Sequence, residues 1–412
     1  MNIGSIVKYY RLRNGLTQAE LSNGICSISH LSKIESNKYS PHKETLEELF
    51  KKMHIEWEKE VVGYKKFEEK LSRFISHSVY YDFESMETLY KELKENEDYL
   101  QSTDLVNKYE LYKLRYYLYK RDTSQAKRQH QLVEKLRPTF NDYERIVAKV
   151  ISIMFYISIG EDERAEQLFA KIDEDAERIP KLLEGEYFYQ RAWLLHKKTK
   201  YGKSSYYAEM AVEHFLKDFN YIRLMHAQLL LAINFTSRDL YLQSEKLFTI
   251  LMRNTQMMGQ GELYQHTLYN LSVLYNRMGN HTDAYELLVE LKSIISVESG
   301  FYDAVLLNML HTSLEAGIDS PNALEELKVK MYKSKDPYLE IHYEYYKKTK
   351  FSQQELYDYS ENIMFPFLRK YGYIEEGRRI AWRLARYYKE KEDYEKVDFF
   401  SDYYYAEGDK EL

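Results

Sequence analysis

The stretch QHTLYNLSVLYNRMGNHTDAYELL, residues 265–288, decides the fold of this 412-residue chain. Numbered from its first residue, it carries large side chains at positions 4, 7 and 11 (Leu268, Leu271 and Tyr275), which lie on one face of a helix. A glycine at position 15 breaks that helix, and Ala284 supplies a small residue at position 20. Two helices can approach closely where a side chain is small, so the pattern predicts a pair of packed helices.

The same pattern recurs along the chain. A small residue precedes an apolar patch at Ala126, Ala165, Ser244, Ala284 and Ala323, with spacings of 39, 79, 40 and 39 residues. The period of about 39–40 residues is typical of helix-pair solenoids, and residues 265–288 resemble the tetratricopeptide (TPR) pattern. We therefore expect an all-α protein with about nine helix pairs, built as a right-handed TPR-like solenoid that follows an N-terminal helix-turn-helix domain.

Composition agrees with a helical solenoid. Gly and Pro number only 15 and 6, which disfavours the many turns of a β-sandwich or barrel. The 42 Tyr residues suit half-buried positions in thin helical layers. A single cysteine, Cys26, allows no intramolecular disulfide, and no apolar run is long enough to span a membrane. We expect a cytoplasmic protein with no membrane partner.

The first sixty residues have a different organisation. Short helical patterns are separated by Asn14–Gly15 and Asn23–Gly24, and Thr17 with Glu20 forms the sequence of a capping box. Residues 1–43 carry six basic and two acidic groups, a local charge of +4 in a chain whose net charge is −6. Two short helices joined by a tight turn in a basic domain indicate a helix-turn-helix that contacts DNA.

In such a domain the second helix enters the major groove. Here that helix is expected from Ser27 to Ser36. A lysine can bond guanine, serine and histidine can bond either base, and isoleucine can touch a thymine methyl group, whereas flanking polar groups suit phosphates. The predicted DNA-binding residues are Gln18, Ser27, Ile28, Ser29, His30, Ser32, Lys33 and Lys38. The alternative is a structural helical domain that binds no DNA.

Two stretches, Gly15-Leu16-Thr17-Gln18 and Leu31-Ser32-Lys33-Ile34-Glu35, resemble the Xre/Cro class of repressor domains. That resemblance implies an internal ion pair between Arg11 and Glu35. The stretch from Gly24 to Glu35 resembles, still more specifically, the peptide-pheromone regulators of the RRNPP group, and in particular their neutral-protease regulators. The resemblance covers the whole chain, divided as 1–60 for the DNA-binding domain, 61–80 for a linker helix and 81–412 for a TPR-like domain that binds a signalling peptide.

The first helices of TPR pairs line an inner groove, and positions 2, 5, 6, 9, 12 and 13 of the pattern face it. Amide side chains can bond a peptide backbone, and Arg or Lys can bind a carboxylate. This alignment predicts the peptide-binding residues Arg115, Gln190, Arg191, Lys197, His266, Tyr269, Asn270 and Asn308. For each of them the alternative is a surface polar group or a packing contact between repeats.

Motifs of catalysis are missing from the sequence: it contains no GxxxxGK[ST], GxGxxG, HExxH, CxxC or GxSxG. We therefore expect no enzymatic activity, no cofactor and no bound metal. The neutral-protease regulators also resemble the Rap proteins, some of which dephosphorylate a response regulator with a Gln in the helices before the repeats. Here no Gln occurs between Gln18 and Gln101, which argues against that activity but not against binding.

The sequence thus predicts a quorum-sensing transcription regulator that binds a palindromic operator as a homodimer or higher oligomer. A short signalling peptide in the groove would shift the balance between two conformations, and the helix near residues 57–74 would transmit the change. The alternative function is a Rap-like scaffold that sequesters a response regulator of the sporulation phosphorelay and releases it when the peptide binds.

Overall fold

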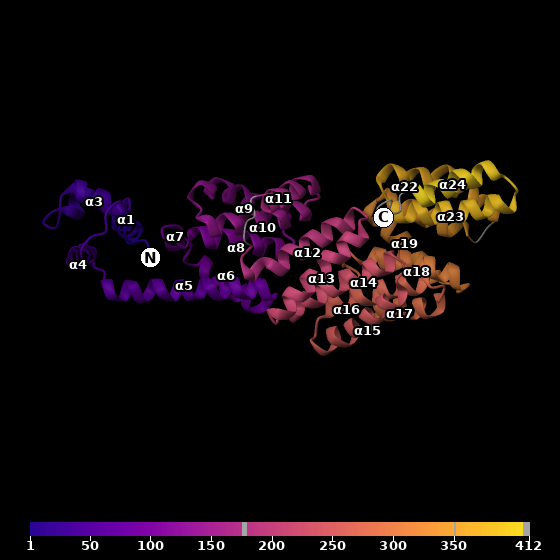
Figure 1. The fold of residues 1–412 in the computed structure, drawn as a ribbon, viewed down its shortest axis with the longest axis horizontal. Coiled ribbons are helices and arrows are strands. Elements are labelled where there is room, and N and C mark those ends of the chain that lie inside the picture. Colours follow the sequence, from indigo (N-terminus) through magenta and orange to yellow (C-terminus); the bar gives the residue numbers. More distant parts are fainter. Residues whose placement is uncertain (175–178, 350–351, 407–412) are drawn as a thin grey trace. The chain divides into compact units, whose positions relative to one another are not determined.

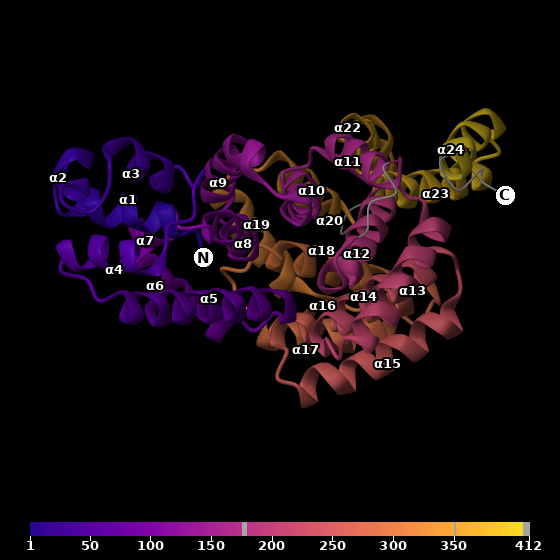
Figure 2. The ribbon, with the colours of Figure 1, turned by 60° about the vertical axis from the view of Figure 1, so that its left-hand side comes forward.

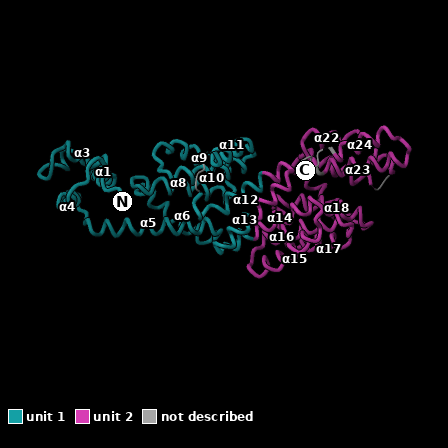
Figure 3. The backbone as a smooth tube through the Cα atoms, viewed as in Figure 1, with its two compact units in different colours: residues 1–194, 210–224 teal, residues 195–209, 225–412 magenta. Residues whose placement is uncertain are grey.

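The structure is a computed structural model, and it describes residues 1–174, 179–349 and 352–406. Within these ranges every regular element is helical, which confirms the predicted all-α class (Figure 1). The chain divides into two compact units, shown in different colours in Figure 3. The first unit comprises Met1–Leu194 and Met210–Leu224, and the second comprises Leu195–Glu209 and Met225–Leu412.

Four short helices form the head of the first unit: α1 Ile3–Arg13, α2 Gln18–Ser22, α3 Ile28–Glu35 and α4 Lys43–Lys52. The predicted capping box is present, since the Thr17 side chain accepts the Glu20 amide and the Glu20 side chain accepts the Thr17 amide. Gly4 lets α1 approach the end of α3, because a Cβ at that position would lie 1.9 Å from the carbonyl oxygen of Ile34. The predicted capping box is therefore confirmed, and the absence of a side chain at Gly4 permits the close packing of α1 on α3.

A long helix, α5 (Trp57–Tyr80), leads from the head to the repeats, and α6 (Phe83–Lys94) packs along it (Figure 2). It ends at Tyr81, whose φ of 63° is left-handed and stops the helix. A short helix, α7 (Glu97–Gln101), follows. The predicted linker, residues 61–80, thus lies inside a longer helix; the division into three segments stays a prediction.

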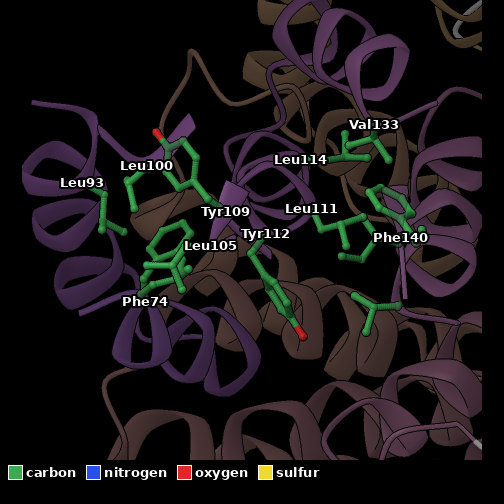
Figure 4. Packing of buried hydrophobic residues seen from close by; sticks show 14 of the residues in the cluster. Phe74, Leu93, Leu100, Leu105, Tyr109, Leu111, Tyr112, Leu114, Val133 and Phe140 are labelled. Atoms are coloured by element: carbon green, nitrogen blue, oxygen red, sulfur yellow. The ribbon is translucent and has the colours of Figure 1, made fainter. Parts of the chain in front are cut away.

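Helix pairs continue the first unit. Their elements are α8 Val106–Tyr119, α9 Thr123–Leu136, η1 Arg137–Thr139, α10 Asp142–Ser158, α11 Asp162–Glu174, α12 Lys181–Lys197 and α13 Tyr201–Lys217. Figure 4 shows α8 buried on two sides, with Phe74 and Leu93 gathered on one side and Val133 and Phe140 on the other. A helix with two apolar faces joins its neighbours into one continuous core.

Further pairs form the second unit. They are α14 Tyr221–Ser237, α15 Tyr241–Met257, α16 Gly261–Arg277, α17 His281–Ile294, α18 Tyr302–Ala316, α19 Pro321–Ser334, α20 Pro337–Lys348, α21 Gln353–Tyr359, η2 Ser360–Met364, α22 Phe365–Tyr371, α23 Ile374–Glu390 and α24 Tyr394–Ala406. The residues of α12, α13 and α14 are divided between the two units. In the second half of the array, η2 is a π-helix that leads into α22, whose first turn contains Pro366.

The small residues of the repeat are buried as predicted. Ala165, Ser244 and Ala284 are each 0% exposed, and Ala126 and Ala323 are 1% exposed. Ser204 on α13, also 0% exposed, supplies the small residue of the repeat that lies between Ala165 and Ser244. The period of 39–40 residues is therefore the period of the helix pairs.

Several tyrosines join neighbouring helices by donating to carboxylates, a role that the sequence analysis did not predict. Tyr302 donates to Glu326 over 2.7 Å, and Tyr338 donates to Glu376 over 2.7 Å. A ring on the apolar side and a hydroxyl on a carboxylate suit positions that are half-buried. No helix in the described ranges is both long and apolar enough to cross a membrane.

Candidate DNA-reading helix and ligand-binding face

The helix α3 presents most of the predicted DNA-binding residues to solvent. Ser27 caps it, because its hydroxyl accepts the amide of His30 over 3.1 Å. On the inner side, Leu31 and Ile34 are fully buried and fix the helix in the head. The exposed residues are Ser27, Ile28, Ser29, Ser32, Lys33 and Lys38. Their binding roles stay predictions, but the surface they need is open.

Two members of the predicted set are less exposed. His30 is half-buried, and its ring meets that of Tyr39 edge-on with centroids 4.5 Å apart. Gln18 is also half-buried, and its amide donates to Glu35 Oε2 over 2.8 Å. Part of each side chain is therefore engaged within the head, by a neighbouring ring for His30 and by a buried carboxylate for Gln18, and their DNA-binding roles stay predictions.

The internal ion pair implied by the Xre/Cro resemblance is present. Arg11 Nη2 donates to Glu35 Oε2 over 2.9 Å, and Arg11 Nη1 donates to the carbonyl oxygen of Leu16 over 2.8 Å. The hydrogen bond with Glu35 raises the pKa of Arg11 above its ordinary value. This network ties α1, α3 and the turn before α2, and so holds α3 in its presenting position.

Hydrogen bonds that the sequence did not predict fasten the head to α5 and α7. Glu60 on α5 accepts the hydroxyl of Tyr10 over 2.7 Å and that of Tyr99 over 2.6 Å. Nearby, Asp104 accepts the hydroxyl of Tyr64 over 2.9 Å and pairs with the N-terminal amine of Met1 at 3.2 Å. The residues involved lie far apart in the sequence, so no spacing pointed to them. The head is therefore docked on the start of the linker helix.

In the first unit, Arg115 lies in a charge cluster rather than on an open surface. It is 0% exposed, and its Nη2 donates to Glu186 Oε2 over 3.0 Å. Arg223, 1% exposed, donates to the other oxygen of Glu186 over 2.9 Å, and Gln190 donates to the same oxygen over 2.7 Å. We call Arg115, Glu186 and Arg223 the buried charge cluster. The repeat pattern placed Arg115 on the groove face and did not foresee its partner 71 residues away; its role in peptide binding stays a prediction.

Aromatic rings surround this cluster. The guanidinium carbon of Arg223 lies 4.1 Å from the ring centroid of Tyr189 and 4.3 Å from that of Tyr81, distances typical of cation–π contacts. Burial alone would raise the pKa of Glu186, but the charges of Arg223 and Arg115 outweigh burial and lower it to about 2. The carboxylate is thus ionised at every physiological pH.

Two other predicted residues of α12 point elsewhere. Arg191 is half-buried; its Nη1 pairs with Asp173 on α11 at 2.8 Å and lies 3.1 Å from the hydroxyl of Tyr187. Lys197 is exposed near the end of α12, on the part of that helix assigned to the second unit. Arg191 therefore faces α11, whereas Arg115 and Gln190 meet at Glu186.

In the second unit, the structure brings two predicted residues together. The rings of His266 and Tyr269 lie 4.6 and 4.8 Å from that of Phe301. Asn270 donates to the carbonyl oxygen of His266 on its own helix over 2.8 Å. Asn308 is 7% exposed and donates to Ser272 over 2.9 Å, which is the packing contact between repeats given as its alternative.

Basic groups that the sequence analysis missed gather around the side chain of His311. Burial, followed by the charges of Arg379, Arg383, His281 and His342, holds the pKa of His311 well below its ordinary value. Burial raises the pKa of Tyr269 above its ordinary value, while the charge of Arg379 lowers this pKa and that of Glu376 raises it. These groups come mostly from α16, α18, α20 and α23, the first helices of their pairs, which the TPR pattern places along the inner face.

Known regulatory proteins share this sequence pattern. Residues 7–59 match the family model described as Helix-turn-helix. The transcriptional activator NprA of Geobacillus stearothermophilus is 21% identical over 404 residues, covering 92% of this chain and 97% of NprA. The regulatory protein RapD of Bacillus subtilis (strain 168) is 27% identical over 250 residues, covering 58% of this chain and 67% of RapD.

Solved structures show the same fold. The apo form of the quorum sensor NprR from B. thuringiensis matches with a TM-score of 0.63 and 15% identity, covering 82% of this chain and 99% of that one. NprR in complex with its cognate peptide NprX matches with a TM-score of 0.58 and 16% identity, covering 80% and 97%. The sequence and fold similarities confirm the resemblance to the RRNPP regulators of the NprR type.

Proposed function

We propose that this chain is a quorum-sensing transcription regulator, in which the head binds double-stranded DNA and a short signalling peptide bound by the repeats switches that binding. The observation that carries the proposal is the open face of α3 on a basic head, in a chain that aligns over 92% of its length with the transcriptional activator NprA. A helix presented in this way fits the major groove.

On the DNA side, Lys33 and the exposed side chains of the first turn of α3 read base edges. Gln18 and Lys38 contact phosphates on either side; Gln18 would donate to a phosphate through the second hydrogen of its amide nitrogen, or after it releases Glu35. Two heads in a homodimer or higher oligomer would read a palindromic operator, with half-sites about 34 Å apart per helical turn.

On the peptide side, an extended backbone suits the inner face formed by the first helices of the pairs. His266, Tyr269 and Asn270 offer rings and an amide in the second unit, and Asn308 would support them. Arg115, Gln190, Arg191 and Lys197 are the candidates on α8 and α12. That NprR has been solved with a cognate peptide supports a peptide as the ligand class.

The switch works as a population shift. A peptide that binds one curvature of the repeats, or one oligomer arrangement, more tightly moves the equilibrium toward it. A coupling free energy of about 1–3 kcal/mol would change DNA affinity about 5- to 150-fold. The contact of Glu60 with Tyr10 joins α5 directly to the head, and its contact with Tyr99 joins α5 to α7, so a shift of α5 would reorient the reading helix.

The test begins with DNA selected from a random library by the purified full chain. Binding of the selected duplex, and of a scrambled duplex with the same composition, is then measured by fluorescence anisotropy at fixed salt. Short synthetic peptides encoded next to the chain's own gene are titrated by calorimetry. Selection of a specific duplex supports the proposal, and enrichment of none overturns it.

A second candidate function rests on the similarity to RapD, which spans 250 residues. In this alternative the chain is a scaffold that sequesters a response regulator of the sporulation phosphorelay in the cytoplasm, without enzymatic activity, and the peptide releases it. A pull-down with purified response regulator, with and without peptide, separates the two. Tight capture together with unchanged transcription in Lys33→Ala would favour the scaffold.

A further inference from the structure

The buried charge cluster of Arg115, Glu186 and Arg223 has more positive than negative charge. Two guanidinium groups share one carboxylate, and Glu186 is the only acidic residue in the described part of the chain that pairs with either. Arg115 is 0% exposed, Glu186 is 2% exposed and Arg223 is 1% exposed. An uncompensated charge in such a place is costly, and the neighbouring aromatic faces offset only part of that cost.

Two donors at this cluster lack an acceptor. Arg223 Nε and the hydroxyl of Tyr119 are both buried, and neither has a hydrogen-bond partner among the described residues. The Tyr119 ring lies 4.3 Å from that of Tyr81, which in turn lies 4.3 Å from the guanidinium carbon of Arg223. Both donors therefore belong to side chains that contact the ring of Tyr81.

The cluster also has a side that faces solvent. Tyr81, Tyr119 and Tyr189 are half-buried; the rings of Tyr81 and Tyr189 contact the guanidinium of Arg223, and the ring of Tyr119 contacts that of Tyr81. Entry of a small group to Arg223 would require one of these tyrosine side chains to rotate. An anion with two oxygens can accept from Nε and from the hydroxyl at the same time.

We propose that Arg223 and Tyr119, with Arg115 behind them, form a carboxylate-binding site that completes the charge balance of the cluster. The inference rests on the proposed function in one respect: there, the carboxylate belongs to the signalling peptide, either as its C-terminus or as an acidic side chain. Arg223 was not among the residues predicted from sequence, because nothing in its local pattern marks it.

The position of the site lets a bound carboxylate influence the head through α5. Arg115 Nε donates to the carbonyl oxygen of Ser78 over 3.3 Å, and Asn220 donates to that of Val79 over 3.0 Å. Both acceptors belong to the last turn of α5, which ends at Tyr81 beside Arg223. An anion that draws Arg223 or Tyr81 toward it therefore acts on the end of the helix whose beginning holds the head.

The test uses sodium acetate as the probe, because it offers a carboxylate and little else. The thermal unfolding midpoint of the full chain is measured while acetate replaces chloride at constant ionic strength and pH 7, with inorganic phosphate as a parallel series. A ligand that binds only the folded state raises the midpoint with concentration. Variants Arg223→Gln and Tyr119→Phe are compared with Tyr112→Phe, which removes a buried hydroxyl from the same helix outside the Arg223 contacts.

We expect acetate to raise the midpoint of the wild type and of Tyr112→Phe. Acetate binding should be at least about fivefold weaker in Tyr119→Phe, because one hydrogen bond to a charged acceptor is lost. Arg223→Gln should show no response. If that variant does not fold, the comparison of Tyr119→Phe with Tyr112→Phe decides.

Three results would overturn the proposal: an acetate response equal in all variants, no difference between acetate and chloride, or a response to phosphate but not to acetate. The last would assign the site to free phosphate. If the acetate response depends on Arg223 and Tyr119 but the protein binds no peptide, the proposed function is contradicted and the carboxylate site still stands.

Discussion

Tyr10 of α1 donates its hydroxyl to Glu60 of α5 over 2.7 Å, and this bond joins the DNA-reading head to the helix that leads into the repeats. Glu60 is 7% exposed and also accepts Tyr99, so the three side chains form one small polar core. The head is thus docked on the array through specific side chains, and its orientation depends on them.

Removing the Tyr10 hydroxyl should loosen that docking. We expect Tyr10→Phe to lower the free energy of unfolding by about 1–2 kcal/mol, because the buried Glu60 loses a donor. Urea denaturation measures the change, and Tyr9→Phe is the matched control, since Tyr9 bonds only the exposed Arg13 in this region. Equal stability of the two variants would show that the bond contributes nothing.

Glycine at position 4 is required by packing. A Cβ there would lie 1.9 Å from the backbone oxygen of Ile34, so Gly4→Ala should push α1 off α3 and cost about 1–3 kcal/mol. A Cβ added at Gly63 on α5 would meet nothing within 4 Å, so Gly63→Ala should instead stabilise the chain by about 0.5–1 kcal/mol. Chemical denaturation gives the sign of the change in the free energy of unfolding for each variant. Changes of the same sign in both variants would refute this packing argument.

Acid should weaken the buried charge cluster. The pKa of Glu186 is about 2 in the folded chain against an ordinary value of 4.5, so its pairing stabilises the fold above pH 4.5 and is lost as pH falls toward 2. The difference corresponds to about 3 kcal/mol. In urea denaturation at pH 3, 5 and 7, Glu186→Gln should be less stable at pH 7 and lose less stability on acidification, whereas the exposed control Glu95→Gln should follow the wild type.

Replacement of Lys33 should affect DNA binding most clearly. If Lys33 reads a base, Lys33→Ala should weaken binding of the selected duplex by about 1–3 kcal/mol. It should also relax the sequence preference at one position. Lys127→Ala, which replaces an exposed lysine on α9, removes the same charge far along the chain and serves as the control. An unchanged footprint and affinity in Lys33→Ala would remove this residue from the DNA-binding set.

Asn270 should matter for the peptide but not for the fold. It is half-buried and bonds only its own helix among the described residues, so Asn270→Ala removes little core volume. We expect about five- to tenfold weaker peptide binding by calorimetry with an unchanged unfolding midpoint. The exposed Asn322→Ala is the control. An unchanged peptide affinity in Asn270→Ala would show that the TPR alignment was misplaced.

The sequence predicted what depends on local pattern. The capping box at Thr17 and the buried small residues Ala165 and Ala284 follow from spacing along one helix or one pair, and the structure confirms them. The ion pair of Arg11 with Glu35 came from the family resemblance and is present.

Contacts between distant residues could not be read in this way. Arg115 and Glu186 lie 71 positions apart, so the TPR pattern, which placed Arg115 on the groove face, gave no sign of this buried ion pair. Glu60 and its tyrosine donors come from three helices, and Arg223 meets Glu186 only through the stacking of the pairs. Such pairings depend on tertiary placement, which a repeat pattern defines for backbones but not for side chains.

The central claim is that peptide binding changes how the head binds DNA. The most direct measurement is the fluorescence anisotropy of the selected duplex with the full chain, at fixed salt, with and without a saturating peptide that calorimetry has shown to bind. We predict a change in DNA affinity of about 5- to 150-fold. Identical DNA affinity in the presence of a demonstrably bound peptide would contradict the claim.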